Sequence, residues 1–475
     1  MKIRITSILV ILIILINSTI AFADIEDTEE NVNINTIKQE VIQTTSNITD
    51  NPKLNSRIAL VYDRASGRIL FDKNGDKTTP MASTTKIMTA IVVVENSNLS
   101  DIVTIDSKSA GTGGSRLGLK KNDKITVNDL LYGLMLRSGN DAAVALAIHV
   151  GGSVEGFAEL MNKKARKLNL TSTHFMVPHG LDMDGHYTTA YELAKMADYA
   201  LKNKKLKEIV STKTCTININ NNPKVISNTN ELLGSVSGVY GVKTGFTNGA
   251  GRCLVTACKR DSLDIITVII GADTKKIRTS DSMKLIEYSF KNYKIINIKK
   301  KVEEQFEKWK ELNEKRIIIN KGKNSKVELK LEDINFEKMA VKNTQLDNIT
   351  IEINSLYYLE APIEKNRVIG NVKIMLGKDT IGVLQIYNKN EIEKTEDELD
   401  TYLLRFKDMK NHWAREDVEY MAELGIVNGD ENDKFRPEDR VSRAEFATMI
   451  SKAMGLDTTE YENSFFDVVS DDWYS

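Results

Sequence analysis

The chain has 475 residues, of which 41% are hydrophobic, so it can form ordinary packed cores in several domains. Its 65 Lys and Arg residues are balanced by 66 Asp and Glu residues, which argues against nucleic acid as a general partner. The three cysteines are too few for a disulfide scaffold.

The first 23 residues have the three-part layout of a secretory signal. Lys2 and Arg4 give a positive start, residues 5–16 are almost wholly apolar, and residues 21–23 (Ala-Phe-Ala) form a small-residue cleavage pattern. The apolar core is short for a bilayer span, so we expect cleavage after this pattern and not a retained anchor. The mature chain is therefore expected to be secreted.

Residues 24–55 are rich in Asn, Thr, Glu and Ile without a sustained period, so we expect a flexible tether. A strand is expected at 57–62, followed by a turn and a return strand at 68–72. From Pro80 the pattern becomes helical, and the apolar run 87–94 predicts a helix that is buried on all sides. Apolar spacing predicts further helices at 127–136, 141–150, 156–167, 189–201 and 280–290.

Strand character then returns, and together these elements form one domain over residues 56–291. Cys253 and Cys258 lie five positions apart in one strand and so face opposite sides, which predicts two buried thiols that do not bond to each other. Strands first and last with helices between them predict an α+β fold, with an antiparallel sheet covered by helices. The later strands, of which the last two form a hairpin, are expected at 239–246, 252–259 and 263–271.

The remainder of the chain divides into two further parts. Short alternating runs predict a small all-β domain over 292–388, followed by a charged linker at 389–404. Residues 405–475 contain a weak repeat, because Phe-Lys-Asp at 406–408 returns as Phe-Phe-Asp at 465–467. The strands of the small domain are expected at 316–320, 327–331, 349–353, 368–375 and 380–387.

Ser83-Thr-Thr-Lys86 opens the buried helix. Positions i and i+3 share a helix face, so the hydroxyl and the amine can touch. A serine hydroxyl needs a base before it can act as a nucleophile, and a lysine can serve if burial lowers its pKa. Ser83 also lies near the helix start, where unpaired N–H groups can stabilise an oxyanion. Taken alone, this spacing also occurs at many surface helix starts.

Two more polar motifs fall on suitable elements. Residues 138–140 (Ser-Gly-Asn) lie between two predicted helices, where a turn can direct polar side chains into a cleft or simply cap a helix. Residues 243–245 (Lys-Thr-Gly) lie in a predicted strand, with Lys243 and Gly245 on one face. A peptide with a free carboxylate could lie along this strand by β-addition, although an exposed edge lysine is the alternative.

The order of the three motifs, each on the expected helix, turn or strand, is specific for penicillin-binding proteins and class A β-lactamases. Over residues 55–387 the chain resembles the low-molecular-mass D-alanyl-D-alanine carboxypeptidases, the serine peptidases that bind penicillin. This resemblance implies a transpeptidase-like fold followed by the family's second, β domain. It includes Pro80-Met-Ala-Ser-Thr-Thr-Lys-Ile-Met-Thr89, Ser138-Gly-Asn-Asp-Ala142, Pro178-His-Gly-Leu-Asp182, Val242-Lys-Thr-Gly-Phe-Thr247 and Ala250-Gly-Arg-Cys253.

The resemblance implies three catalytic residues. Ser83 would form the acyl-ester, Lys86 would take its proton, and Ser138 would relay a proton toward the leaving group. The substrate implied is a peptidoglycan stem peptide, with β-lactam antibiotics as inhibitors. No metal or other cofactor is expected.

The substrate-binding residues are implied in the same way. Asn140 would hold the substrate amide, and Lys243 and Thr244 would bind the terminal carboxylate. The backbone N–H of Phe246 would form the oxyanion hole together with that of the nucleophile. The full implied set is Asn140, Lys243, Thr244, Gly245 and Phe246.

The C-terminal segment resembles a mostly helical S-layer homology module, a unit that binds cell-wall polysaccharide, plus the start of a second copy. Trp413 and Arg443 are candidates for contact with an anionic sugar by stacking and charge, with a core Trp413 and a structural Arg443 as alternatives. We therefore expect the protein at the cell wall, or on the outer face of the cytoplasmic membrane. The matching residues are Phe406-Lys-Asp408, His412-Trp-Ala414, Gly425-Ile-Val-Asn-Gly429, Phe435-Arg-Pro437 and Val441-Ser-Arg-Ala-Glu445.

Two other functions compete with a carboxypeptidase that removes the terminal D-Ala of peptidoglycan stem peptides. A β-lactamase shares all three motifs, but Glu155, Glu159 and Glu192 fall in predicted helices, and none opens a convincing loop to activate a deacylating water. A non-catalytic wall-binding protein could keep the fold, but the intact motif residues argue against it. We therefore predict a serine-type D-Ala-D-Ala carboxypeptidase.

Overall fold

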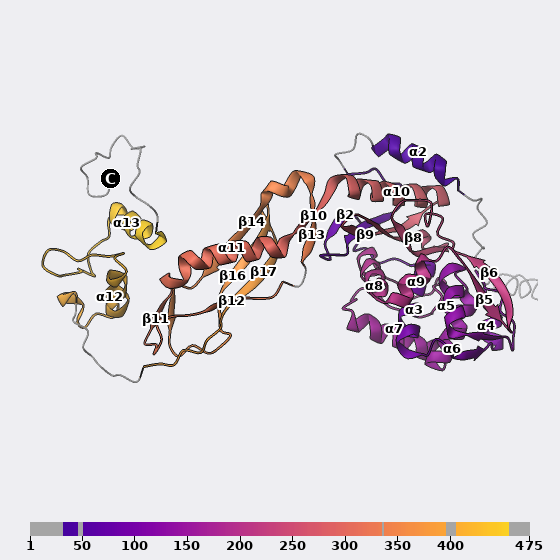
Figure 1. Ribbon diagram of the computed structural model, residues 1–475, viewed down its shortest axis with the longest axis horizontal. Helices are drawn as coiled ribbons and strands as arrows, with labels where there is room; N and C mark the ends of the chain where they lie inside the picture. Colours follow the sequence, from indigo (N-terminus) through magenta and orange to yellow (C-terminus); the bar gives the residue numbers. More distant parts are fainter. Residues whose placement is uncertain (1–31, 46–50, 335–336, 396–404, 456–475) are drawn as a thin grey trace, which may run out of the picture. The chain divides into compact units, whose positions relative to one another are not determined.

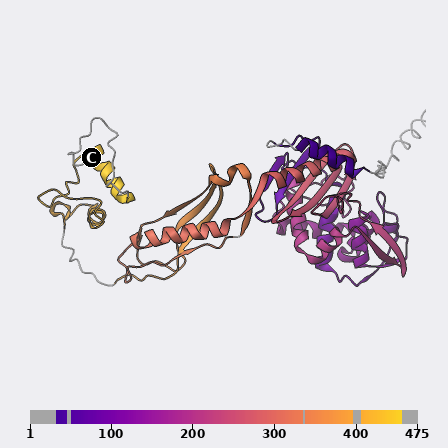
Figure 2. The ribbon, with the colours of Figure 1, turned by 45° about the horizontal axis from the view of Figure 1, so that its top comes forward.

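The structure, a computed structural model, describes residues 32–45, 51–334, 337–395 and 405–455 (Figures 1 and 2). The chain forms two compact units, residues 1–393 and residues 394–475. The expected signal at 1–23 and the second copy of the repeat at 465–467 lie outside the described residues.

A five-stranded antiparallel sheet with strand order β2-β1-β9-β8-β7 forms the centre of the larger unit. The central strands are buried almost throughout, because both faces of the sheet are covered. The predicted strands and the β8–β9 hairpin are confirmed, and β7, which carries the Lys-Thr-Gly motif, is an edge strand. The strands are β1 (Ile58–Asp63), β2 (Ile69–Lys73), β7 (Val239–Thr247), β8 (Gly251–Arg260) and β9 (Leu263–Ala272).

Most of the helices gather around α3 on one face of this sheet (Figure 1). Residues 86–93 of α3 are all buried, which confirms the prediction of a helix buried on all sides. The short helices and the small sheets β3–β4 and β5–β6 were not predicted, because their apolar patterns are too brief. The elements are η1 (Ala82–Thr85), α3 (Lys86–Asn96), β3 (Ile102–Thr104), α4 (Ser107–Ala110), β4 (Lys124–Thr126), α5 (Val127–Leu136), α6 (Asn140–Gly151), α7 (Val154–Lys167), α8 (Ala190–Lys202), α9 (Lys204–Ser211), β5 (Thr214–Ile219) and β6 (Asn222–Ser227).

The opposite face of the sheet is covered by α10 (Lys275–Asn292) and by α2 (Ile34–Thr45). The prediction of a flexible tether over 24–55 is therefore wrong for the part that forms α2. Ile37 and Val41 are buried against this face, because their spacing of four places both side chains on one side of the helix. Cys253 and Cys258 lie in the separate cores on the two faces, and both thiols are free and buried, as predicted.

The second domain of this unit is β-rich, but it also contains the helix α11 (Ile298–Asn313), so the prediction of an all-β domain is wrong. Ile298, Val302 and Phe306 of α11 pack into one core with the sheet β12-β17-β16-β14. The predicted linker also begins too early, because Ile392 is buried and pairs with Ile363. The remaining elements are β10 (Tyr293–Asn297), η2 (Glu314–Arg316), β11 (Ile318–Asn320), β12 (Leu329–Leu331), β13 (Lys338–Lys342), η3 (Asn343–Asn348), β14 (Ile349–Ser355), β15 (Tyr358–Glu360), β16 (Val368–Leu376) and β17 (Asp379–Asn388).

The C-terminal unit is only partly helical, which corrects the prediction of a mostly helical module. It contains η4 (Lys407–Met409), α12 (Arg415–Glu423) and α13 (Arg443–Met454), joined by long irregular segments. Phe406 and Met409 are among the most deeply buried residues of its small core. Among the residues described in either unit, no single helix is long and apolar enough to cross a membrane, although the bent pair α6 and α7 passes that test together on length and composition alone.

Candidate active site

Ser83 lies in η1, the tight turn that leads into α3. Met81 and Ala82 before it and Thr84 after it are buried, whereas Ser83 is half-buried and lines a cleft of about 730 Å³. Ala82 adopts a left-handed backbone conformation with φ of 48°. The local turn therefore exposes one hydroxyl at the floor of the cleft.

The Lys86 amine is fully buried directly below this hydroxyl. Its Nζ donates to Ser83 Oγ, to Asn140 Oδ1 and to the carbonyl oxygen of His179, each at 2.7 Å. The three acceptors come from η1, from the start of α6 and from the loop at 178–182. The predicted pair of Ser83 and Lys86 is thus in direct contact, and a third motif residue shares the same amine.

The loop at 178–182 holds one side of the site. A Cβ on Gly180 would lie 1.9 Å from the carbonyl oxygen of Ala82, so only glycine allows this loop to lie against η1. Asp182 accepts from the Thr247 hydroxyl and from the backbone N–H of Gly249, which ties the loop to the turn after β7. The loop also contacts the base of the site directly, because the carbonyl of His179 accepts from Lys86.

Burial lowers the pKa of the His186 imidazole to about 4. Its Nδ1 accepts from the backbone N–H of Met176, so in the neutral ring Nε2 carries the proton and faces Thr85 Oγ1 at 2.8 Å. The Thr85 hydroxyl in turn donates to the Ala82 carbonyl. A neutral histidine therefore supports the turn on which Ser83 lies.

Ser138 and Asn140 lie where α5 ends and α6 begins. Ser138 has a left-handed backbone with φ of 60° and lines the cleft. Asn140 uses Oδ1 for Lys86, and its Nδ2 donates to the carbonyl of Gly113 at 2.8 Å, which leaves one N–H of that amide for a ligand. The motif is thus part of the cleft wall as well as a helix start.

Asp141 was not predicted as a site residue, yet it fixes the neighbouring wall. Its buried carboxylate accepts from the backbone N–H groups of Leu117, Gly118 and Leu119 at 2.7 to 3.0 Å. These bonds hold the segment that follows Gly113 against the start of α6. The signal was present in the Ser-Gly-Asn-Asp sequence, but the partners are more than twenty residues away.

The Lys-Thr-Gly motif on β7 forms the facing wall. Lys243 is almost fully buried, which excludes the alternative of an exposed edge lysine, and burial followed by the charge of Arg278 lowers its pKa to about 7. Its Nζ donates to the carbonyl of Thr244, whose hydroxyl lies 2.7 Å from that of Thr229. A Cβ on Gly245 would lie 3.1 Å from the backbone nitrogen of Ser83, so the glycine permits close approach of β7 to η1.

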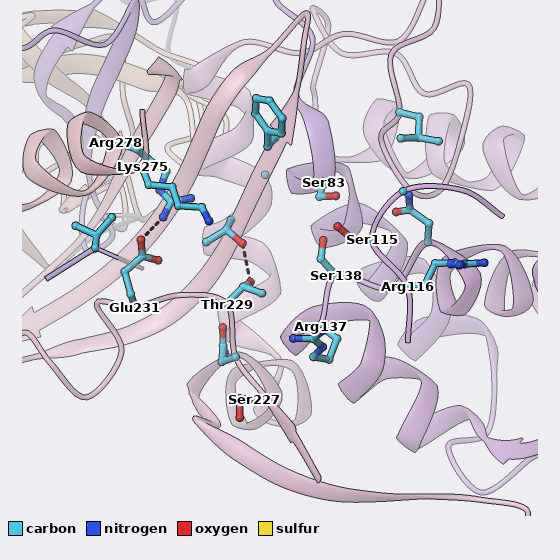
Figure 3. Close-up of a pocket in the computed structure, with 18 of the residues that line it drawn as sticks. Ser83, Ser115, Arg116, Arg137, Ser138, Ser227, Thr229, Glu231, Lys275 and Arg278 are labelled. Carbon is cyan, nitrogen blue, oxygen red and sulfur yellow. Dashed lines mark hydrogen bonds and ion pairs between the residues drawn. The ribbon is translucent and has the colours of Figure 1, made fainter. Parts of the chain in front are cut away.

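The cleft also contains charged groups that the sequence did not reveal. Arg278, from α10, forms an ion pair with Glu231, and both line the cleft on the Thr229 side (Figure 3). Figure 3 shows Arg137 and Arg116 around Ser138 on the other side. Phe246 of β7 also lines the cleft, and the Arg252 guanidinium lies 4.5 Å from its ring centre. Of the eight residues predicted for catalysis and substrate binding, six line this cleft. The other two, Lys86 and Lys243, are buried beside it, in contact with Ser83 and with the carbonyl of Thr244.

The two residues predicted for wall polysaccharide belong to the other compact unit. Trp413 is 88% exposed, which excludes the alternative of a core tryptophan, and its ring lies 5.5 Å from that of His412. Arg443 is the first residue of α13 and is also exposed.

Three family descriptions match the chain. Residues 45–274 match the D-alanyl-D-alanine carboxypeptidase family, peptidase S11. Residues 290–394 match the C-terminal domain of penicillin-binding protein 5, and residues 405–447 match the S-layer homology domain.

Individual relatives cover most of the larger unit. D-alanyl-D-alanine carboxypeptidase DacF of Bacillus subtilis is 30% identical, over 71% of this chain and 86% of the relative. DacA of Haemophilus influenzae is 33% identical over the same shares of the two chains. The crystal structure of penicillin-binding protein 5 from Haemophilus influenzae is similar with a TM-score of 0.61 and 28% identity, over 73% of this chain and all of that one. The chain therefore belongs to the D-alanyl-D-alanine carboxypeptidase family of serine peptidases.

Proposed function

We propose that the protein is a serine-type D-Ala-D-Ala carboxypeptidase, which removes the terminal D-alanine from peptidoglycan stem peptides through an acyl-enzyme on Ser83. The observation that carries this proposal is the contact of the buried Lys86 amine with the Ser83 hydroxyl, at the floor of a cleft that also contains the other two motifs. Membership of the carboxypeptidase family supports the same activity.

The three contacts of Lys86 suit the role of a base. A neutral amine has two N–H donors and one lone pair. Asn140 Oδ1 and the His179 carbonyl can only accept, so they take the two donors. The lone pair is then directed at Ser83, whose hydroxyl can donate to it. Lys86 would thus accept the Ser83 proton as the Oγ attacks the carbonyl carbon of the penultimate D-alanine.

The remaining motif residues would complete the reaction. The developing oxyanion would be bound by the backbone N–H groups of Ser83 and Phe246, donors that are typically worth about 3 kcal/mol each. Ser138, on its strained turn, would relay a proton to the amine of the departing D-alanine. Water would then attack the ester, so that the acyl group leaves as the shortened peptide and Ser83 regains its proton.

Substrate binding would use the open edge of β7. The peptide would pair along this strand, with its amide held by the remaining N–H of Asn140. Its terminal carboxylate would lie at Lys243 and Thr244, near the Arg278 guanidinium. Gly245 would allow the peptide backbone to come close.

The direct test combines product release with covalent labelling. The mature protein should release D-alanine from an acylated tripeptide that ends in D-Ala-D-Ala, and it should gain the mass of one benzylpenicillin molecule. A protein that destroys the drug and releases no D-alanine would instead be a β-lactamase. The contacts of Glu192 argue against that outcome, because its carboxylate is already bound by the backbone N–H of Ser172 and the Thr173 hydroxyl.

The lowered pKa of Lys243 predicts a pH dependence of substrate binding. With a pKa near 7, this amine is charged below neutral pH and loses its charge above it, so carboxylate binding weakens on the alkaline side. We expect KM for the tripeptide to rise by about 10-fold between pH 6 and pH 9. Lys243→Arg keeps its charge throughout this range and should flatten the rise. Equal pH profiles for parent and variant would contradict the assignment of Lys243 to the carboxylate.

We also propose that the C-terminal unit attaches the enzyme to cell-wall polysaccharide, with Trp413 stacking on a sugar and Arg443 binding an anionic group. Such attachment requires a secreted protein, in agreement with the expected signal at the N-terminus. The exposure of both side chains supports this role.

A truncated chain tests this attachment. A chain that ends at Lys394 keeps Ile392 in its core, and we expect it to release D-alanine like the parent but to be washed from purified walls. Arg443→Ala should weaken retention as well, whereas Lys452→Ala, an exposed cation on the same helix, should not. Retention of the truncated chain equal to that of the parent would contradict the proposal.

A further inference from the structure

The N-terminal segment reaches into the active-site cleft. Val32 and Ile34 line the same cleft as Ser83 and Thr244, although they precede the first strand of the domain by more than twenty residues. Both side chains are half-buried and pack against the core that lies under α10. The cleft wall thus includes residues that the sequence placed in a tether.

A packed helix fixes the position of this wall. Figures 1 and 2 show α2 running along α10, and Ile37 and Val41 are each only 1% exposed in the shared core. Glu40 adds an ion pair with Lys276 of α10, at 3.1 Å. Because Ile37 and Val41 hold α2 against α10, Val32 and Ile34 are placed by a packed helix.

The wall is at the start of the helix that packs on α10, and α10 borders the end of the cleft where the leaving residue would be. α10 supplies Lys275 and Arg278 to this end, and Arg278 pairs with Glu231 there. In the proposed reaction the terminal carboxylate binds near Thr244 and Arg278, so the side chain of the terminal residue has to fit between Ser83 and the residues of this end. Val32 and Ile34 line the same cleft with apolar, β-branched side chains that have few rotamers.

The two wall residues precede the part of the chain that matches the carboxypeptidase family. The match to the carboxypeptidase family begins at residue 45, the last residue of α2. Val32 and Ile34 therefore precede the residues that match the family.

From these observations, and on the basis of the proposed carboxypeptidase function, we propose that Val32 and Ile34 determine specificity by limiting the size of the residue that leaves. The enzyme then releases a small terminal residue such as D-alanine from an uncrosslinked peptide. It rejects a terminal residue with a long side chain, and with it a residue whose side chain continues into a second peptide. The bond broken and the acyl-enzyme formed are the same for all of these substrates.

The test compares two peptides that differ only in the leaving residue. One acylated tripeptide ends in D-Ala-D-Ala and the other in D-Ala-D-Leu, so the terminal carboxylate is the same in both. The parent should show a kcat/KM at least about 10-fold lower for D-leucine release, the scale on which a pocket separates side chains that differ by methylene groups. We define the ratio as kcat/KM for D-alanine release divided by kcat/KM for D-leucine release. The variant Val32→Ala/Ile34→Ala should lower this ratio several-fold by raising kcat/KM for D-leucine release. The control Lys38→Ala/Gln39→Ala, at exposed positions of α2, should leave the ratio unchanged.

A second variant separates an effect on specificity from a loss of folding. Val32→Phe enlarges the wall and should widen the ratio, and a single cooperative urea unfolding transition in both wall variants shows that the fold is kept. A ratio that stays at the parental value in both wall variants, or a parent that releases both residues equally well, would overturn the inference while the carboxypeptidase function stands. A parent that neither releases D-alanine nor binds penicillin would overturn both.

Discussion

Ser83→Ala is expected to abolish covalent labelling by benzylpenicillin and to lower D-alanine release by at least about 10⁴-fold. In the proposed mechanism, the Ser83 hydroxyl is the only group of the enzyme that forms a covalent bond to the substrate. Its removal leaves the Lys86 amine in place, with Asn140 and the His179 carbonyl as partners, so the fold should be kept. Intact mass after incubation with the drug measures the first effect, and a D-alanine assay measures the second.

Ser115 offers a matched control for this experiment. It lines the same cleft, and Figure 3 shows it close to Ser138. Ser115→Ala should keep both labelling and D-alanine release within a few-fold of the parent. Persistent labelling of Ser83→Ala, or loss of labelling in Ser115→Ala alone, would mean that the nucleophile has been wrongly assigned.

The placement of the motif residues could be predicted because each motif combines a local spacing with a local element. The i and i+3 spacing of Ser83 and Lys86 at a helix start was sufficient to predict their contact. Period two in a strand was likewise sufficient to place Lys243 and Gly245 on one face of β7. Each motif by itself could also be a surface helix start, a helix cap or an exposed edge lysine. The order of the three motifs together argued against these alternatives.

The contacts that hold these residues in place could not be predicted in the same way. Lys86 meets Asn140 across 54 positions and the His179 carbonyl across 93, and no local period reports such pairs. The fit of Gly180 against η1 depends on backbone atoms and leaves no side-chain signal.

Helices α2 and α11 were missed for a different reason. Each has an apolar stripe of few residues within a strongly polar sequence, and the stripe is stable only because a partner covers it. From composition we predicted a tether where α2 lies, and no helix where α11 lies. The partners, α10 for α2 and the core of the β-rich domain for α11, are decided by the tertiary fold.

Lys86→Met should lower both penicillin labelling and D-alanine release by about 10² to 10⁴-fold, the usual contribution of a positioned base. Methionine keeps much of the volume of the side chain but has neither a lone pair of comparable basicity nor an N–H donor. The Asn140 Oδ1 atom and the His179 carbonyl then lose their donor in a buried site. Each unsatisfied acceptor should cost about 1–3 kcal/mol in the free energy of unfolding, which urea denaturation can measure.

Lys73→Met separates the two effects. Lys73 also donates to two backbone carbonyls, those of Leu54 and Ser56, but it lies on β2, at the opposite edge of the sheet from β7. Its replacement should lower the stability and leave the labelling rate unchanged. If Lys86→Met is destabilised but labelled at the parental rate, another group must take the Ser83 proton. In that case the buried amine would only position Asn140 and the loop at 178–182.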